Sequence, residues 1–434
     1  MIEQMPKYDS YKESGVEWLG EIPEHWSLIP NKRIFNLKKK LVGKRSSEYD
    51  LLSLTLKGII KRDMDNPEGK FPAEFDTYQE VSSGDFVFCL FDVEETPRTV
   101  GLSKFDGMIT GAYTVFNPSE QYNREFLYYF YLNLDTDKKL KPLYKGLRNT
   151  ISKEAFFSFK TFVPPIDEQV KIASYLDKKT SQIDEAIAIK QKQIELLKER
   201  KQIIIQQAVT QGLNPDAPMK DSGVDWIGEI PEHWTVSKIG HYARVYNGST
   251  PSRDVKRYWD EGTIPWMSSG KVNDYIISTP SELITTAALR ECSLRIFPKG
   301  TVLIGIVGQG KTRGTSAMLA IDAVINQNVA GIIPSEKILS EFLHQYLIQA
   351  YDEVRNQGQG SNQEALNCQI LSSFKIAFPS VSEQKEIVHF IAKQSQKLDQ
   401  SIDIQFNQIE KLKEYKATLI NSAVTGKIKV TELV

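Results

Sequence analysis

The sequence predicts a mixed α/β (α+β) fold in which two domains are joined by two long helices. Three observations support this fold class. A short motif occurs twice in the 434 residues, a long helical pattern occurs twice, and the segments between them combine short buried strands with short helices. Because motif, variable segment and long helix follow in the same order both times, the chain is predicted to be an internal duplication.

The short motif is a box of fifteen residues. It reads KESGVEWLGEIPEHW at 12–26 and KDSGVDWIGEIPEHW at 220–234. Twelve of the fifteen positions are identical, and the other three exchange Glu for Asp or Leu for Ile. A second match aligns PPIDEQ at 164–169 with PSVSEQ at 379–384. The match between the two boxes is too close to have arisen by chance, so each half of the chain is predicted to be one copy of a repeated unit.

Each Glu-Gln segment leads into a long pattern without Pro or Gly, in which apolar residues recur at alternating steps of four and three. That spacing is typical of a coiled-coil seam. A helix of about 45 residues would be roughly 65 Å long at 1.5 Å per residue. Because a lone amphipathic helix of this length needs a partner, we expect the two to pair and to space the domains. The residues predicted to form the seam are Leu176, Ile183, Ile187, Ile194, Leu197, Ile204, Ile391, Leu398, Ile402, Ile409, Leu412 and Leu419.

The variable segments contain turn-then-strand patterns at 84–90 and 300–305 and short apolar helices at 126–132 and 341–348. A breaker-rich stretch with Gly212 and Pro215 separates the two copies. The predicted boundaries are 1–163 for the first domain, 164–212 for the first long helix, 213–219 for a linker, 220–378 for the second domain and 379–434 for the second long helix.

Composition excludes little and permits nucleic-acid binding. The net charge is −1, but residues 27–160 carry 21 basic against 18 acidic residues and residues 235–376 carry 14 against 12. No run of about 18 apolar residues predicts a membrane span, and the N-terminus lacks the apolar core of a signal peptide. The three cysteines lie far apart, which predicts neither a disulfide framework nor a zinc ribbon. We therefore expect a cytoplasmic protein.

The duplicated boxes, the segment AVTQGLNPDAP at 208–218 and the Pro-x-x-x-Glu-Gln entries to both helices resemble the DNA specificity subunits of Type I restriction–modification systems, along essentially the whole chain. In the second domain, GSTPS at 248–252, IPW at 264–266 and NQN at 326–328 are similar to that family's recognition domains. The first domain departs from this pattern. It has no clear GxTP segment and no IPW segment, and LSLT at 52–55 stands near the expected place.

The resemblance implies two target-recognition domains, each of which reads one half of a bipartite target in double-stranded DNA. It implies antiparallel long helices with a pseudo-twofold layout, which set the gap between the half-sites and dock two methyltransferase subunits. It also implies restriction subunits, which are ATP-driven translocases and nucleases, as further partners. In dimeric DNA-binding proteins, protein geometry fixes the separation of the half-sites in the same way.

Candidate DNA contacts are short hydroxyl, amide and basic side chains on Gly- or Pro-bounded loops, because these groups suit phosphate and base-edge contacts. The competing interpretation is that the loops are solvated turns, stabilised by hydrogen bonds of their own side chains. The candidates are Ser249, Thr250, Ser252, Arg253, Ser268, Ser269, Lys271, Lys311, Arg313, Asn326, Gln327, Gln359, Ser361 and Asn362 in the second domain, with Lys61, Arg62, Arg98, Lys145, Arg148 and Asn149 in the first.

One motif favours a different function. Residues 305–312 read GIVGQGKT and match the phosphate-binding pattern GxxxxGK[ST], which makes a P-loop nucleotide-binding protein with a coiled-coil arm the alternative. A P-loop must open a helix, but Arg313-Gly314-Thr315-Ser316 does not favour one. The other interpretations are a glycine-rich hairpin that presents Lys311 and Arg313 to DNA and a purely structural turn.

No motif predicts catalysis. The five histidines form no HExxH pattern or close cluster with Cys or Asp, and no amino-methyltransferase motif occurs. His25 and His233 lie in the duplicated box and are predicted to be structural. We therefore expect no catalytic residue, no metal and no cofactor. A coiled-coil scaffold without DNA contact is the remaining alternative.

Overall fold

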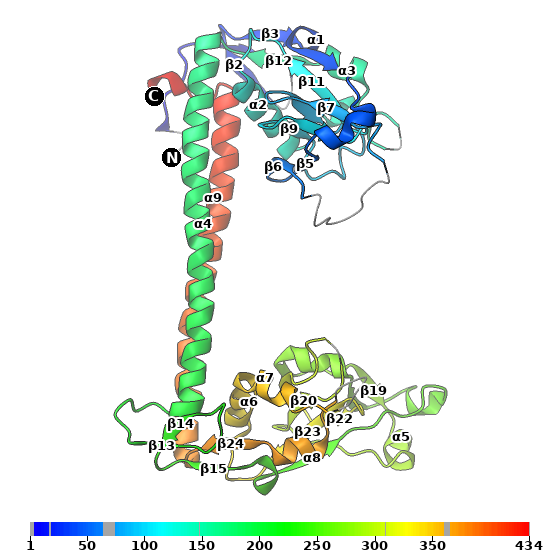
Figure 1. The fold of residues 1–434 in the computed structure, drawn as a ribbon, viewed down its shortest axis with the longest axis vertical. Coiled ribbons are helices and arrows are strands. Elements are labelled where there is room, and N and C mark those ends of the chain that lie inside the picture. Colours follow the sequence, from blue (N-terminus) through cyan, green and yellow to red (C-terminus); the bar gives the residue numbers. More distant parts are fainter. Residues whose placement is uncertain are drawn as a thin grey trace. The chain divides into compact units, whose positions relative to one another are not determined.

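The computed structural model describes residues 4–16, 19–63, 74–146, 148–308, 310–359 and 365–433. The chain divides into two compact units (Figure 1). Unit 1 comprises residues 1–191 and 406–434, and unit 2 comprises residues 192–405. Each unit therefore contains one variable domain, the beginning of one long helix and the end of the other.

Unit 1 is built on an antiparallel four-stranded sheet. In sheet order its strands are β4 (Phe35–Lys38), β11 (Thr114–Pro118), β8 (Phe86–Phe88) and β9 (Val100–Leu102). Helix α2 (Arg124–Thr136) packs against β9. It begins where the Asn123 side chain accepts a hydrogen bond from the Phe126 amide at 2.7 Å, which satisfies an otherwise unpaired helix donor.

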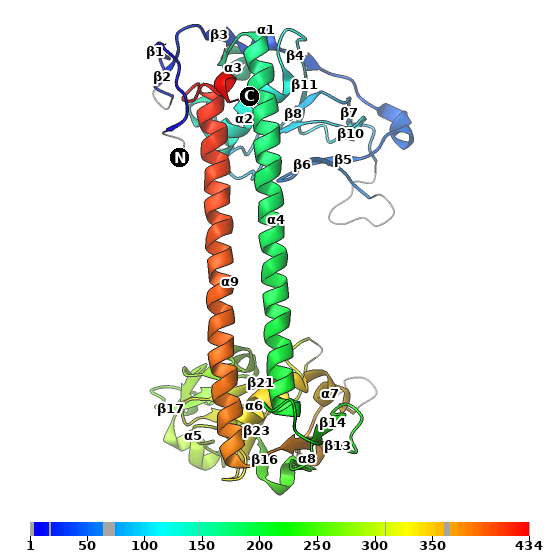
Figure 2. The same ribbon diagram turned by 90° about the vertical axis from the view of Figure 1, so that its left-hand side faces the viewer.

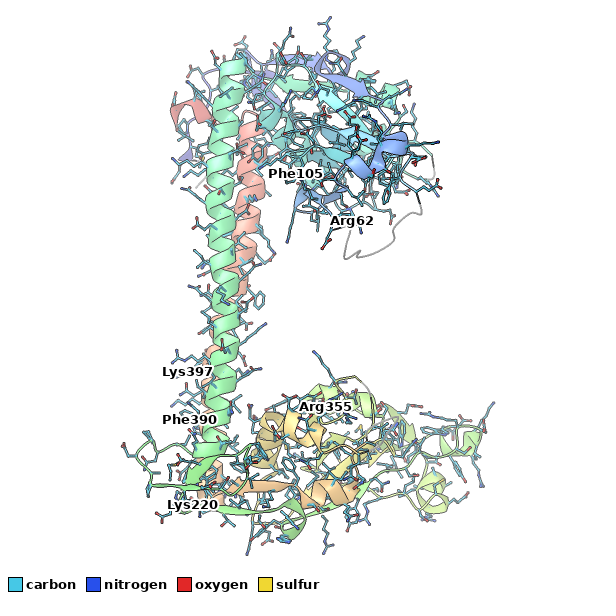
Figure 3. The ribbon with its side chains drawn as sticks, viewed as in Figure 1. Arg62, Phe105, Lys220, Arg355, Phe390 and Lys397 are labelled. Carbon is cyan, nitrogen blue, oxygen red and sulfur yellow. The ribbon has the colours of Figure 1, made fainter. Side chains whose placement is uncertain are left out.

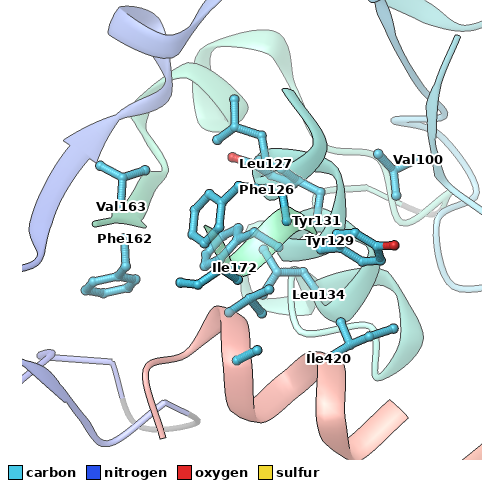
Figure 4. Close-up of a cluster of buried hydrophobic side chains, with 14 of the residues drawn as sticks. Val100, Phe126, Leu127, Tyr129, Tyr131, Leu134, Phe162, Val163, Ile172 and Ile420 are labelled. Atoms are coloured by element: carbon cyan, nitrogen blue, oxygen red, sulfur yellow. The ribbon is translucent and has the colours of Figure 1, made fainter. Parts of the chain in front are cut away.

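The core of unit 1 is aromatic (Figure 4). Phe126, Phe130 and Leu134 recur every four residues along α2 and are fully buried, so one helix face lies against the sheet. Tyr131, on the same helix, is also buried, and its hydroxyl donates to the Asn31 side chain at 2.8 Å. The buried hydroxyl thus has the partner that its burial requires.

The described part of unit 1 also contains four small strand pairs and two short α-helices. The pairs are β1 (Tyr11–Glu13) with β2 (Glu21–Pro23), β3 (Ser27–Pro30) with β12 (Lys160–Val163), β5 (Leu52–Thr55) with β6 (Gly58–Lys61), and β7 (Gln79–Val81) with β10 (Gly107–Ile109). The helices are α1 (Asn31–Ile34) and α3 (Lys153–Ser158).

Unit 2 contains a five-stranded sheet. In sheet order its strands are β16 (Ala243–Asn247), β23 (Val329–Pro334), β20 (Val302–Gly305), β21 (Ser316–Leu319) and β18 (Ile276–Ile277). Helix α6 (Ser340–Gln349) packs against β20 and β21 through Phe342, Leu343 and Tyr346, which are all buried. Helices α7 (Tyr351–Asn356) and α8 (Cys368–Ser373) follow.

Unit 2 also has a three-stranded sheet and further strand pairs. The sheet order is β19 (Glu282–Ile284), β17 (Ile264–Met267) and β22 (Val324–Ile325), with α5 (Thr286–Glu291) beside it. The pairs are β13 (Met219–Asp221) with β14 (Glu229–Pro231) and β15 (Thr235–Lys238) with β24 (Lys375–Phe378).

The duplication is visible in the strand order. The series β4-β11-β8-β9 of unit 1 has the topology of β16-β23-β20-β21 in unit 2, and α2 occupies the place in the chain that α6 occupies in the second copy. Two equivalent connections confirm the alignment. The Ile151 amide donates to the Leu90 carbonyl at 2.8 Å, and the Leu366 amide donates to the Ile306 carbonyl at 2.9 Å. The first domain therefore shares the fold of the second although it lacks the GxTP and IPW segments.

The long helices are α4 (Ile166–Gln211) and α9 (Val381–Val424), which run side by side within each unit (Figures 1 and 2). In unit 1, Lys416 lies 2.6 Å from Asp184, and in unit 2, Lys201 lies 2.7 Å from Asp399. All twelve predicted seam residues are buried or half-buried. The predicted fold class, two mixed domains with two long paired helices, is confirmed.

The duplicated box anchors each long helix at its first turn. In unit 1, the Trp26 indole N–H donates to Glu168 at 3.2 Å, and His25 Nε2 lies 2.8 Å from the same carboxylate. In unit 2, the Trp234 indole donates to Glu383 at 3.0 Å, and His233 Nε2 lies 2.8 Å away. The Glu of each Pro-x-x-x-Glu-Gln entry is thus held by the Trp and His that end the box.

The same boxes receive the far ends of the helices. Gly212 follows α4 with a φ of +76°, and a Cβ there would lie 3.4 Å from Trp234. Gly426 follows α9 with a φ of +73°, and a Cβ there would lie 2.2 Å from Pro23. A side chain at Gly426 would clash, and only glycine adopts this backbone region without strain. Each box therefore joins the start of one helix to the end of the other.

A buried histidine makes the stability of unit 2 depend on pH. His344 on α6 is 2% exposed, and burial lowers its pKa to about 4. In the unfolded chain the imidazole takes up a proton below about pH 6.5, so we expect unfolding to become easier as the pH falls from 6.5 towards 4. The loss is expected to reach about 3 kcal/mol.

The measurement is the protection from amide hydrogen exchange of peptides that cover α6, in the wild type and in His344→Gln at pH 7.5 and at pH 5, corrected for the intrinsic exchange rate at each pH. The variant removes the imidazole, so the difference between the two proteins should narrow at the lower pH. A difference that stays constant with pH would contradict the assignment.

Candidate nucleic-acid interface

The candidate loops of the second domain meet at one edge of the five-stranded sheet. Asn247, the last residue of β16, pairs with Ala330, and Gly305, the last residue of β20, pairs with Val329. The ends of β16 and β20 therefore lie beside the start of β23. The loops 248–253 and 306–315 and the segment 326–328 consequently emerge together.

Backbone hydrogen bonds bring further segments to this edge. The Asn326 amide donates to Met267 at 3.0 Å, at the end of the parallel pair β17 and β22. The Ser249 amide donates to Ile325 at 2.9 Å. The Leu366–Ile306 bond adds the segment that leaves α7. Segments separated by more than 100 residues in the sequence thus form one surface, which we call the loop edge of unit 2.

Arg253 is held on the loop edge by an acid and two indoles. Its guanidinium makes two hydrogen bonds to Glu282, at 2.6 and 2.8 Å, and lies 3.7 Å from the Trp259 ring centre. The Trp259 and Trp266 indoles donate to the Ser252 and Ser249 carbonyls. The cluster fixes the loop that carries Ser249 and Ser252, whose side chains are exposed.

The segment 326–328 divides into a structural and an exposed part. Asn326 is 7% exposed, and its side-chain oxygen accepts a hydrogen bond from the Asn328 amide at 3.1 Å. The side chain therefore stabilises its own turn. It is not on the surface, where a DNA contact was predicted. Gln327 is exposed and accepts from the Thr250 hydroxyl, which joins two of the loops.

The glycine-rich segment is a hairpin loop. β20 ends at Gly305, and the next regular element is β21, which pairs antiparallel with β20. A phosphate-binding loop would lead into a helix instead, so the P-loop interpretation is wrong. Lys311 is exposed on this loop. Arg313 is 7% exposed, so its side chain is not presented at the surface as predicted.

The other candidates of unit 2 are partly engaged. Ser268 Oγ lies 3.0 Å from Ser281 Oγ, while Ser269 is half-buried at the start of the next turn. Lys271 donates to Asp274 at 2.7 Å. Gln359 is exposed and pairs through its backbone with Ala365. Ser361 and Asn362 lie outside the described residues.

Unit 1 has an equivalent loop edge. Lys145 pairs with Thr150 across a tight turn, and the Asp92 amide donates to the Arg148 carbonyl at 2.9 Å. Asn149 in this turn has a φ of +43°. Lys145 and Arg148 are exposed. These three candidates therefore lie beside the loop that follows β8, at the place that corresponds to Gln359 in unit 2.

The remaining candidates of unit 1 differ from this picture. Arg98 lies 3.5 Å from the buried Asp135, and its side chain is 19% exposed, so it supports the fold. Lys61 ends the β5–β6 hairpin and lies 2.5 Å from Asp50. Arg62 follows it, and its amide donates to Leu51 at 2.8 Å. We find Lys61 and Arg62 on the hairpin and not at the loop edge.

Sequence reasoning missed two residues on α7. Arg355 and Tyr351 bind the main chain of the glycine-rich loop. Their spacing of four residues on a short helix gives no signal of this contact, because the partners are carbonyl groups about 40 residues earlier in the chain. Within the described residues, no group of three His, Cys, Asp or Glu side chains could hold a metal ion, and no described helix is long and apolar enough to cross a membrane.

Comparison with known sequences relates this chain to one family. Residues 99–199 and 231–414 match the family model described as the Type I restriction modification DNA specificity domain. The MjaIX specificity subunit of Methanocaldococcus jannaschii is 37% identical over 173 residues, which are 37% of this chain and 38% of that protein. The EcoR124I/EcoR124II specificity subunit of Escherichia coli is 27% identical over 38% of this chain and 41% of that protein. The chain therefore aligns with about two fifths of the length of these two relatives. The putative MjaX specificity subunit of M. jannaschii is 26% identical over 98% of both chains.

Solved structures share the fold. A chain from a study of complex assembly and conformational transition of the type I R-M system superposes with a TM-score of 0.70 at 14% identity, over 93% of this chain and 98% of that one. The HsdS subunit from Thermoanaerobacter tengcongensis gives a TM-score of 0.58 at 15% identity, over 94% and 98%. At these identities the superpositions establish the architecture of two mixed domains and two long helices.

Proposed function

This chain belongs to the Type I restriction modification DNA specificity family, and on that premise we propose that it reads a bipartite double-stranded DNA target, one half-site with each domain. The observation that carries the proposal is the convergence of five loop segments at one edge of the unit 2 sheet, with an equivalent edge in unit 1. Loops that a rigid sheet holds together can present hydroxyl, amide and basic groups in a fixed arrangement, as base reading requires.

The exposed groups at the two loop edges are the proposed contacts. Hydroxyl and amide groups suit base edges, and basic groups suit phosphates or the O6 and N7 atoms of guanine. The proposed set is Ser249, Ser252, Lys311, Gln327 and Gln359 in unit 2, and Lys145 and Arg148 in unit 1. The neighbouring Arg253 and Lys271 already bind acidic side chains, so any contact of theirs with DNA would require exchange of those partners.

We further propose that the chain is not itself catalytic and that methyltransferase and restriction subunits supply the chemistry. This proposal is supported by the relatives, which are named specificity subunits. We propose α4 as part of the docking surface for methyltransferase subunits, because Ile189, Leu196 and Ile203 recur every seven residues along it with about half of their surface exposed. We also propose that the length of the helix pair sets the gap between the half-sites.

Exchange of residues 27–160 for the corresponding block of a relative is expected to change one half of the target only. The junctions suit a graft because they lie on paired strands: Ser27 pairs with Val163, and Lys160 pairs with Pro30. The measurement is the methylated motif in the genome of host cells that carry the exchanged chain.

The matched control is exchange of residues 235–376, whose ends lie on the equivalent pair of β15 and β24. It should change the other half of the motif. A change in both halves from either exchange would contradict independent reading. Methyl transfer from S-adenosylmethionine by the purified chain alone would contradict the non-catalytic proposal.

A further inference from the structure

A short helix holds the main chain of the glycine-rich loop in unit 2. Arg355 on α7 donates from Nη1 to the Gly310 carbonyl at 2.7 Å and to the Arg313 carbonyl at 2.9 Å. Figure 3 shows Arg355 on α7. A guanidinium that binds two carbonyl groups at once is a strong and directional contact.

Tyr351, one turn earlier on α7, completes the contact. Its hydroxyl donates to the Lys311 carbonyl at 3.1 Å and lies 3.3 Å from Arg355 Nη1. Two side chains of one helix therefore satisfy three carbonyl groups within four consecutive residues of the loop. In an extended loop these carbonyl oxygens would face water or a bound phosphate, and their partial negative charge would repel the phosphate.

Two glycines allow this close approach. Gly314 has a φ of +87°, and a Cβ there would lie 3.2 Å from Arg355 Cβ and 3.3 Å from the Tyr351 carbonyl. At Gly305 a Cβ would lie 2.2 Å from the Thr312 carbonyl, and the Gly314 amide donates to Gly305 at 2.9 Å. Gly305, which begins the apparent phosphate-binding motif, and Gly314, which follows that motif, thus serve to fold the loop tightly against α7.

Lys311 is exposed to solvent, while its main-chain carbonyl is bound by Tyr351. The neighbouring Arg313 is buried, so Lys311 is the basic side chain that this part of the loop presents. The direction of Lys311 therefore depends on the main-chain conformation that α7 imposes.

We propose that Arg355, supported by Tyr351, is a positioning residue for the specificity of the half-site read by unit 2. It fixes the loop segment 310–315 so that Lys311 meets one place on the DNA, and it contacts no base itself. The inference rests on the proposed function of the loop edge, since it explains how one reading loop obtains a single conformation. A loop held in one shape loses less entropy on binding and tolerates fewer wrong partners.

The test compares Arg355→Gln, Arg355→Lys and the control Arg290→Gln in the full chain. Arg290 is an exposed arginine on α5 that makes no side-chain hydrogen bond or ion pair within the described residues. The probes are duplexes that carry the methylated genomic motif of the wild type and duplexes with single base changes in either half. The readout is the ratio of affinities for matched and changed duplexes, which does not depend on the fraction of folded protein.

For Arg355→Gln we expect discrimination in the unit 2 half-site to fall about tenfold, the effect of losing one or two hydrogen bonds from a charged donor. Discrimination in the other half should stay at the wild-type level. Arg355→Lys should recover only part of the loss, because an ammonium lacks the planar fork. Tyr351→Phe should give a smaller loss in the same half-site.

Three results would overturn the inference. The first is an unchanged affinity ratio in Arg355→Gln, and the second is an equal loss of discrimination in both half-sites. The third is wild-type discrimination in Arg355→Lys, which would indicate a role of charge alone. Failure of the proposed function would give a different result: the block exchanges would leave the methylated motif unchanged.

Discussion

Insertion of one residue between Lys198 and Gln202 is expected to abolish function, whereas insertion of four residues in both long helices is expected to preserve function and lengthen the target. One residue turns the rest of α4 by about 100°. Ala208 and Val209, which are 2% and 0% exposed in the core of unit 2, would then be replaced by their polar neighbour Gln207 and by Ala208. Burial of an amide without a partner costs about 1 to 3 kcal/mol, and loss of the seam adds to it.

Four residues behave differently because they make slightly more than one full turn, about 400°. The matched sites are beside Lys201 on α4 and beside Asp399 on α9, which contact each other in unit 2. The insertions add roughly 6 Å to each helix, which approaches two base pairs at about 3.4 Å each. Local winding of a coiled coil can absorb the remaining rotation.

The measurement is the methylated motif of cells that carry each variant. The paired four-residue variant should show both half-site sequences unchanged and a spacer longer by about two base pairs. An active paired variant with the wild-type spacer would show that something other than the helices sets the distance. A one-residue variant that folds and methylates normally would contradict the role of the seam.

The fold class could be predicted because its signals are local and repeated. The identity of the two boxes and the 4-3 spacing of residues such as Ile183 and Ile194 need no tertiary information, and both are reflected in the structure. The shared topology of the two domains could not be read in this way. Their strands have only two to six residues, and their pairing joins segments far apart in the sequence, such as β4 with β11.

The candidate site was predicted less well, since exposure depends on tertiary packing. Arg313 and Lys311 are both basic residues on one glycine-rich loop, yet one is buried and the other exposed. Asparagine is a residue type that can bind adenine edges, but the Asn326 side chain accepts a hydrogen bond within its own turn. Arg355 was missed because its partners are main-chain carbonyls, which every residue carries and no sequence pattern marks.

The duplicated box is explained by its contact with the helix entry, and the two copies differ in one respect. In unit 1, the Tyr8 hydroxyl also donates a hydrogen bond to Glu168. Burial is the main cause that raises the pKa of Tyr8 far above its usual value, and this hydrogen bond is the second cause. Glu168 is 8% exposed, and both Tyr8 and Trp26 are buried. In unit 2, Glu383 is half-buried, and its partners are the Trp234 indole and the exposed His233.

Glu168→Ala is therefore expected to destabilise unit 1 more than Glu383→Ala destabilises unit 2. The first change leaves two buried donors without an acceptor, and the second leaves one. At about 1 to 3 kcal/mol for each buried unsatisfied donor, the expected losses are about 2 to 6 and about 1 to 3 kcal/mol. Because a chain with two units need not unfold in one step, the measurement is local: amide hydrogen exchange of peptides that cover β2 and β3 in one variant and β14 and β15 in the other. Each variant should accelerate exchange in its own unit, with the larger effect at β2 and β3.

Tyr8→Phe should reproduce part of the Glu168→Ala effect. Equal acceleration in the two units, or a larger one at β14, would show that the additional Tyr8 bond does not strengthen the first box.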